Sequence, residues 1–115
     1  RRAAKQGMVL AQITLGHCYS RGEGVEQDRE QAVHWWGLAA KQDSDIAQHC
    51  LGASYLYGEG VDLDLTQAAH WMHLAADKGH SSAQWYLGVA YHNGDGVDQD
   101  LELVILVNFL QALMR

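Results

Sequence analysis

The chain has 115 residues, 48% of them hydrophobic, which suits one folded domain and argues against disorder. Its formal charge is −6 and its eight Lys and Arg form no basic stripe, so a nucleic-acid partner is disfavoured. No stretch reaches the roughly 18 apolar residues of a membrane span, and the start lacks the apolar segment of a signal peptide. We therefore expect a soluble protein without membrane insertion. Cys18 and Cys50 are too few for a disulfide framework and slightly favour the cytoplasm over the periplasm.

A short string recurs along the chain at a constant interval of 36 residues. Leu15-Gly16 returns as Leu51-Gly52 and as Leu87-Gly88, and the shared string is L-G-x-x-Y-x-x-G-x-G-V-x-x-D. Such a period marks a unit that cannot bury its apolar face alone and must stack on copies of itself. We divide the chain into the end of a preceding repeat's second helix at 1–7 and three repeats at 8–43, 44–79 and 80–115.

Each repeat is predicted to contain two helices, which we name helix A and helix B in chain order. In helix A of the first repeat, Ala11, Leu15 and Tyr19 share one side and are expected to form its core face. Glycines that tolerate positive φ then reverse the chain, and an Asp caps helix B. The predicted turn and capping residues are Gly22, Gly24, Gly58, Gly60, Gly94, Gly96, Asp28, Asp64 and Asp100.

Two further local features are expected from spacing. Helix A of the second and third repeats is predicted to begin with capping boxes, formed by Asp45 with Gln48 and by Ser81 with Gln84. Helix B is predicted to pack through alanines and large apolar residues at spacings of three or four. These residues are Ala32, Trp35, Leu38, Ala39, Ala68, Trp71, Leu74 and Ala75.

The recurring Leu-Gly, Tyr, Gly-x-Gly-Val, Asp and Ala-Ala elements resemble the Sel-one-like repeat family, which is related to the tetratricopeptide repeats. The resemblance covers nearly the whole chain, in two good copies and a third good half. It implies an all-α fold, a right-handed α-solenoid of antiparallel helix pairs whose A helices line the concave side. It also implies a scaffold or adaptor role in protein complexes. Some bacterial members carry a disulfide in every repeat and are linked to β-lactam binding, but their cysteine pattern is missing here.

The side of helix A opposite its core face differs between the copies, so it is the predicted surface for a partner protein or peptide. On the first helix A this side includes Leu10, Ile13 and His17. Aromatic and amphipathic residues of this kind anchor interfaces. The predicted partner-binding residues are His17, His49, Tyr57, Trp85, Tyr86, Val89 and His92. The alternative is that Trp85 and Tyr86 pack between neighbouring A helices.

Other chemistry finds little support in the residue pattern. His70 and His73 stand three apart on one helix but lack a third metal ligand, and the acidic run at 95–100 lacks the spacing and distal Glu of a calcium loop. Cys18 beside His17 lacks an acidic group to orient a catalytic base. We therefore predict no metal, no cofactor and no enzyme. A hydrolase acting on cell-wall material or a β-lactam is the remote alternative, and it would need a base and a nucleophile in one pocket.

The last segment, LELVILVNFLQALMR at residues 101–115, departs from the repeat. Val107 and Gln111 replace a Trp and an Ala of the earlier copies, and the polar residues form one narrow stripe. An exposed terminal helix is normally more polar than this. Burial under a further repeat, self-association and an altered or truncated end all remain open. A homodimer through 101–115, making the chain a structural self-assembly element, is the alternative functional prediction.

Overall fold

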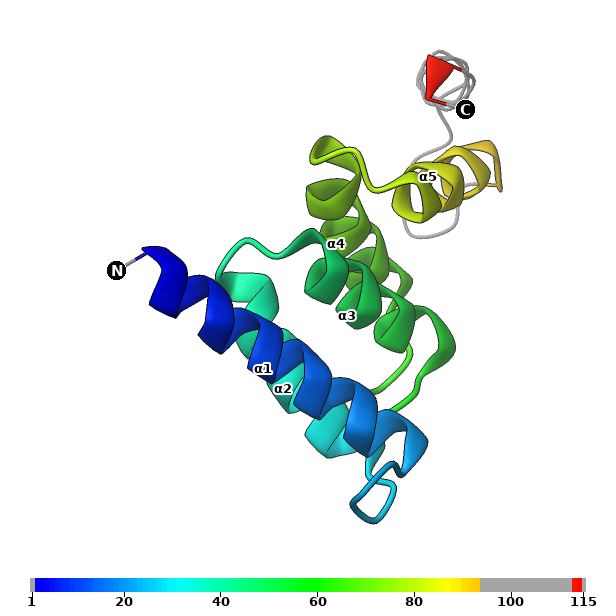
Figure 1. The fold of residues 1–115 in the computed structure, drawn as a ribbon. Helices are drawn as coiled ribbons and strands as arrows, with labels where there is room; N and C mark the ends of the chain where they lie inside the picture. The colour runs from blue at the N-terminus through cyan, green and yellow to red at the C-terminus, as the bar shows by residue number, and fades with distance from the viewer. Residues whose placement is uncertain (1, 94–112, 115) are drawn as a thin grey trace.

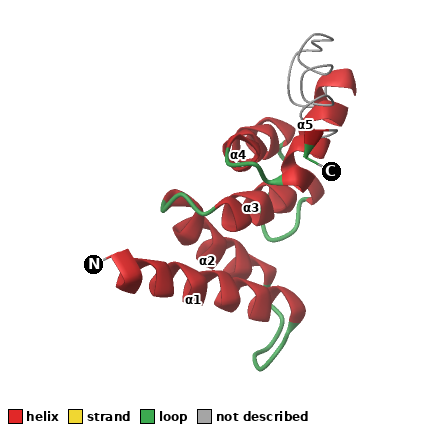
Figure 2. Cartoon of the chain, turned by 45° about the horizontal axis from the view of Figure 1, so that its top comes forward, coloured by secondary structure: helices red, strands yellow, loops and turns green. Residues whose placement is uncertain are grey.

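The computed structural model describes residues 2–93 and 113–114, and this part of the chain contains helices and no strands. Five helices follow in order: α1 (Arg2–Arg21), α2 (Arg29–Lys41), α3 (Asp45–Tyr57), α4 (Leu65–Asp77) and α5 (Ser81–Asn93). Helices α1 to α4 alternate in direction, and α5 crosses the end of α4 at the other end of the row from α1 (Figures 1 and 2). Helices α1, α3 and α5 are the A helices, and α2 and α4 are B helices. The predicted all-α architecture at a 36-residue period is confirmed.

The A–B turns and the caps of the B helices form as the sequence indicates. Gly22 and Gly24 have φ of 70° and 75°, and Gly58 and Gly60 have 66° and 79°, so all four adopt the left-handed backbone that glycine tolerates best. The Oδ1 of Asp28 accepts a hydrogen bond from the backbone N–H of Gln31 over 3.2 Å, and Asp64 repeats this with Gln67 over 3.1 Å. Gly94, Gly96 and Asp100 lie outside the described residues.

The caps of α3 and α5 lie one residue before the predicted positions. Ser44 has extended backbone and its Oγ accepts from the N–H of Ala47, so Asp45 is already inside the helix and the predicted capping box there is wrong. His80 holds the same place before α5, where its Nδ1 accepts from the N–H of Ala83 over 3.4 Å. Gln48 instead reaches across to α2, where its Nε2 donates to the carbonyl of Ala40.

Helix α1 starts earlier than the other A helices and runs unbroken through residues 2–7. At the register of Gly7, Asp43 and Gly79 leave the preceding helix with φ of 73° and 88°. Met8, unlike Ser44 at the same register, has no side-chain acceptor with which to cap a new helix. The chain therefore continues as helix through this point. The assignment of residues 1–7 to an earlier repeat stays a prediction.

Helix B packs directly on the backbone of helix A at a glycine. Trp36 is buried against Gly16, so close that a Cβ on this glycine would lie 2.3 Å from the indole nitrogen. In the second repeat Met72 packs against Gly52 in the same way. The sequence analysis named Trp35, and not Trp36, among the packing residues of helix B. Trp35 is only partly buried because the face of α2 that meets α1 is centred on Trp36.

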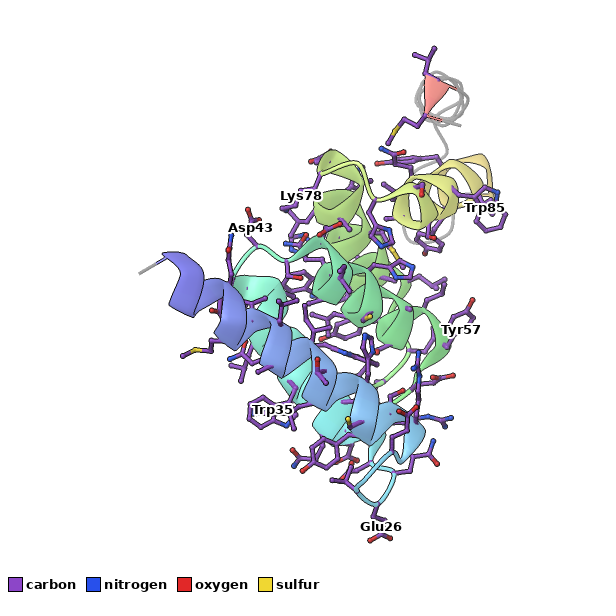
Figure 3. The ribbon with its side chains drawn as sticks, viewed as in Figure 1. Glu26, Trp35, Asp43, Tyr57, Lys78 and Trp85 are labelled. Atoms are coloured by element: carbon purple, nitrogen blue, oxygen red, sulfur yellow. The ribbon has the colours of Figure 1, made fainter. Side chains whose placement is uncertain are left out.

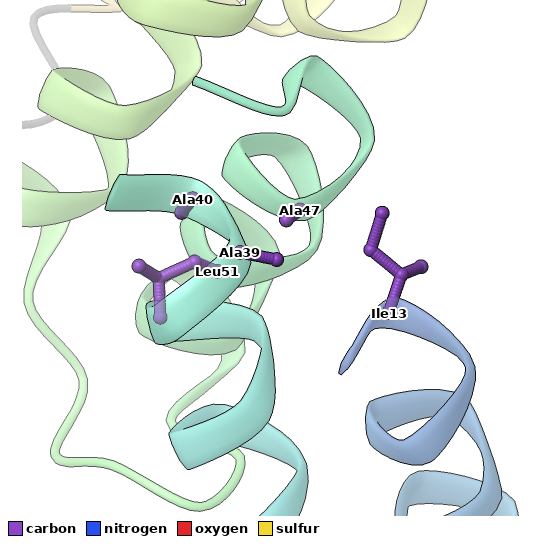
Figure 4. Close-up of a cluster of buried hydrophobic side chains, with 5 residues drawn as sticks. All are labelled: Ile13, Ala39, Ala40, Ala47 and Leu51. Carbon is purple, nitrogen blue, oxygen red and sulfur yellow. The ribbon is translucent and has the colours of Figure 1, made fainter. Parts of the chain in front are cut away.

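The repeats are joined by small apolar residues. Five side chains from α1, α2 and α3 form one buried cluster, shown in Figure 4: Ile13, Ala39, Ala40, Ala47 and Leu51. A second cluster joins α4 to α5 through Met72, Ala75, Ala83 and Leu87. Ile13 is only 6% exposed, so its prediction as a surface residue is wrong. The row of helix A that contains Ile13 packs on the next repeat, a contact that the pattern of a single helix does not reveal.

The predicted core face of the first helix A is largely exposed. Ala11 is exposed and Leu15 keeps 37% of its accessible surface, whereas their counterparts Ala47 and Leu51 keep 0% and 4%. The difference arises because α3 packs this face against α2, while no described helix precedes α1. The prediction of a buried Ala11 and Leu15 is therefore wrong for the first repeat and right for the second. This face depends on a neighbouring repeat for its burial.

Candidate binding surface

The A helices present large apolar side chains to solvent. Leu10 on α1 is 60% exposed, and Ile46, one repeat later at the same register, is 44% exposed. The sequence analysis placed Leu10 on the outer side of helix A, and neither Leu10 nor Ile46 was among the predicted site residues. The signal that could have identified them is that an apolar residue recurs after 36 residues on the outer side of helix A, where the packing of one repeat does not require one. Exposed apolar residues on adjacent helices are the usual material of an interface core.

Tyr57 and Trp85 are the most exposed aromatic residues of the described A helices. Tyr57 ends α3 and is 68% exposed, and Trp85 in the first turns of α5 is 62% exposed. Figure 3 shows both rings projecting outward on the same side of the molecule. Val89 lies one turn after Trp85 and is 37% exposed. The rings of Tyr57 and Trp85 are therefore free to contact another molecule.

Two other predicted residues are more enclosed. The side chain of Tyr86 is half-buried and packs against the cluster of α4 and α5 that contains Met72 and Leu87. His17 is half-buried with its imidazole edge-on to Trp36, at a ring-centroid distance of 5.6 Å. Burial, together with the guanidinium of Arg21, lowers the pKa of His17. The side chain of His92 lies outside the described part of the chain.

His49 sits at a junction between repeats. Its imidazole stacks on that of His80 with a centroid distance of 4.5 Å and an interplanar angle of 20°. Burial of the ring lowers the pKa of His49, and the neighbouring His80 lowers it further. His49 has the register of Ile13 and of Trp85. Because Ile13 packs on α3 and His49 on His80, this row of helix A is the row that meets the following repeat.

Charge is unevenly distributed around this surface. Helix α5 contains no Asp, Glu, Lys or Arg, and α3 contains only Asp45. The two described A–B turns are acidic, and their carboxylates are Glu23, Glu26, Asp28, Glu59, Asp62 and Asp64. Arg21 pairs with Glu23 and Arg29 with Glu59 at 3.7 and 3.8 Å, both on exposed side chains. Helices α3 and α5 thus carry almost no formal charge, and the described A–B turns are acidic.

The groups considered for catalysis or metal binding are engaged elsewhere. His70 lies edge-on to Trp71, whereas His73 shares a hydrogen bond with the hydroxyl of Tyr91. Within residues 2–93 no three His, Cys, Asp or Glu side chains gather as a metal site. Burial raises the pKa of the Cys50 thiol to about 11, so this thiol is a poor nucleophile at neutral pH. Cys18 and Cys50 are both free thiols.

No helix in the described part of the chain is long and apolar enough to cross a membrane. A comparison with curated proteins finds no match. The family model of the Sel1 repeat matches residues 9–44, 45–80 and 81–103, which together make up most of the chain.

The chain belongs to the Sel1 repeat family. Proteins of this family are generally protein-interaction scaffolds. The resemblance noted from the recurring Leu-Gly and Gly-x-Gly-Val strings is therefore confirmed.

Two solved Sel1 repeat structures are similar over almost the whole chain. One is a protective antigen present in uropathogenic Escherichia coli strains that displays an SLR fold, with 41% identity and a TM-score of 0.90 over 99% of this chain. The other is a Sel1 repeat protein from Oxalobacter formigenes, with 30% identity and a TM-score of 0.92 over 96% of this chain. The chain spans only 24% and 45% of the lengths of these two proteins.

Proposed function

We propose that this Sel1 repeat chain is a scaffold that binds an apolar segment of a partner protein or peptide along its A helices. The observation that carries the proposal is the exposure of Tyr57 and Trp85, at 68% and 62%, on helices almost without formal charge. Leu10 on α1 and Ile46 on α3 add further exposed apolar surface to the A helices. Large aromatic side chains contribute most to such interfaces because they bury much area with few rotatable bonds.

The test uses the exposed aromatics against a matched control. A photo-crosslinking amino acid at position 85 would capture and identify a partner, which is then purified for titration. We expect Trp85→Ala and Tyr57→Ala each to weaken its binding about tenfold or more, the usual effect of losing an interface anchor. Leu63→Ala is the control, because Leu63 is 61% exposed but lies in an A–B turn.

The outcome against the proposal is also specific. If the partner binds the Trp85 and Tyr57 variants as tightly as the unchanged chain, while circular dichroism shows all of them folded, the A helices are not the binding surface. Loss of helix content in Trp85→Ala would assign this ring to the core instead. That second result would contradict its 62% exposure.

A homodimer through residues 101–115 is a second proposal. Only Leu113 and Met114 of this segment lie within the described residues, and they are 66% and 52% exposed. Light scattering on the purified chain tests it. We expect a dimer whose mass falls to that of the monomer in Leu113→Glu, since a buried unpaired carboxylate is costly. A monomer at high concentration would end this proposal.

A further inference from the structure

We propose that the junction joining α5 to the second repeat is acid-sensitive, and that protonation of its histidines releases α5 from α3 and α4. The junction is defined by His49 and His80. The effect of this opening on partner binding rests on the proposed function, because α5 carries Trp85 and Val89. The opening of the junction itself does not depend on a partner.

The first observation is the cap of α5. The Nδ1 of His80 accepts the backbone N–H of Ala83 over 3.4 Å, and an imidazole nitrogen accepts a hydrogen bond only when it carries no proton. Protonation turns this acceptor into a donor facing another donor. It also places a positive charge at a helix N-terminus, where cations are disfavoured. In the second repeat Ser44 performs the same capping with a hydroxyl that does not titrate.

The second observation is the stacked pair. The rings of His49 and His80 lie with centroids 4.5 Å apart and nearly parallel, so two imidazolium ions there would repel each other. Burial and the His80 ring both favour the neutral form of His49. In the first repeat the register of His49 is held by Ile13, which is buried and does not titrate.

The third observation concerns two side-chain hydrogen bonds that link α4 and its C-terminal turn to α5. His73 of α4 shares a hydrogen bond with Tyr91 of α5, and this bond can survive protonation because an imidazolium still donates to a hydroxyl oxygen. Gln84 donates to the carbonyl of Ala76, but its buried Oε1 has no hydrogen-bond partner among the described residues. The equivalent Oε1 of Gln48 accepts from Lys78. The start of α5 is thus positioned by the His80 cap and by the stacking of His80 on His49.

The neighbouring charged groups offer little stabilisation to the protonated forms of these histidines. Burial and His80 are the causes that lower the pKa of His49, and neither is a carboxylate. The carboxylate of Asp43 is already paired with Lys78 at 2.7 Å. The other charged or titratable residues of α3, α4 and α5 are Asp45, Cys50, Tyr55, Tyr57, His70, His73, Asp77, Tyr86, Tyr91 and His92. The guanidinium of Arg21 on α1 acts electrostatically on Cys50. Acidification through the ordinary range of histidine therefore weakens the junction without creating a new ion pair.

Amide hydrogen exchange on the whole chain, without a partner, tests the proposal. Exchange is compared at pH 7.5 and pH 5.5 after correction for the intrinsic rate. We expect protection of the α5 amides, Ala83 first, to fall at least about fivefold more than that of the α3 amides, a factor typical of a lost N-cap. The loss should disappear in the double variant His80→Ser and His49→Ile, which copies Ser44 and Ile13 of this chain.

Each result has one interpretation. His70→Gln is the matched control, because His70 is exposed and lies on Trp71, and it should leave the pH effect unchanged. An equal loss of protection in α3 and α5 would overturn the proposal, and so would a pH effect that persists in the double variant. If the junction opens but Trp85→Ala binds a captured partner normally, the acid-sensitive junction stands and the proposed binding surface fails.

Discussion

The ammonium group of Lys78 donates to Oε1 of Gln48 over 3.1 Å and thereby satisfies a buried acceptor that joins helix B to helix A. In the first repeat the Nε2 of Gln42 donates to Oε1 of Gln12 over 2.8 Å, in a more exposed position. The third repeat has Met114 at this register, and the Oε1 of Gln84 lacks a donor among the described residues. One polar contact is thus present in two copies and missing in the third.

This difference predicts opposite effects of two reciprocal substitutions. Lys78→Met should lower the free energy of unfolding by about 1–3 kcal/mol, because it leaves a buried acceptor without a partner. Met114→Lys should raise it by about 1 kcal/mol by supplying the missing donor. Asp43→Asn controls for the ion pair between Lys78 and the exposed Asp43, and it should cost less stability than Lys78→Met. Urea denaturation measures all three, and a destabilising Met114→Lys would contradict the prediction.

Gly16 and Gly52 of helix A, which contact helix B, should lose different amounts of stability when each is replaced by alanine. A Cβ on Gly16 would meet the rigid indole of Trp36 at 2.3 Å, whereas a Cβ on Gly52 would meet the flexible Met72 at 3.1 Å. We expect Gly16→Ala to destabilise by about 1–3 kcal/mol through overpacking. Gly52→Ala should be near neutral, because alanine favours helix by up to about 1 kcal/mol.

A second substitution checks that the indole causes this cost. Trp36→Met in the Gly16→Ala background copies the second repeat and should recover part of the lost stability relative to Trp36→Met alone. Thermal melting of the four variants forms a double-mutant cycle. A coupling near zero would mean that Trp36 is not what the new methyl group meets.

The second turn packs on the first repeat, and this contact predicts a difference between Gly60→Ala and Gly24→Ala. Both glycines have positive φ, so each substitution costs about 1–2 kcal/mol of backbone strain. A Cβ on Gly60 would also lie 2.3 Å from the carbonyl oxygen of Arg29, while a Cβ on Gly24 meets no described atom within 4 Å. Gly60→Ala should therefore cost about 1–3 kcal/mol more in urea denaturation. Equal losses would show that this turn does not fasten the repeats.

The lowered pKa of His17 predicts the direction of one pH effect. Burial, with Arg21 nearby, favours neutral His17 in the folded chain, so below its ordinary pKa of 6.5 the unfolded chain binds more protons. Stability should therefore fall as pH drops from 7.5 to 5, and His17→Gln should reduce this slope. This interval from pH 7.5 to 5 lies above the acidic region in which the Asp43 carboxyl titrates, because the pKa of that carboxyl is lowered. His34→Gln is the exposed control, and an equal reduction there would contradict the assignment to His17.

The repeat made the fold predictable, because its main signals act over short distances. The caps Asp28 and Asp64 reach amides three residues away, and Gly22 and Gly58 need only their own backbone freedom. The candidate site was predictable only in part. The exposed rings of Tyr57 and Trp85 agree with a variable outer face of helix A, whereas Tyr86 packs on the core and His49 on His80.

The sequence alone determined the helical period, the turns and the caps, since each depends on residues within a turn or two of one another. Tertiary structure decided how one register is used in different copies. Ile13 is buried, His49 is stacked on another histidine and Trp85 faces solvent, although all three recur at a 36-residue step. Their surroundings come from neighbouring repeats about 30 residues away, so identical spacing within a helix leads to different burial.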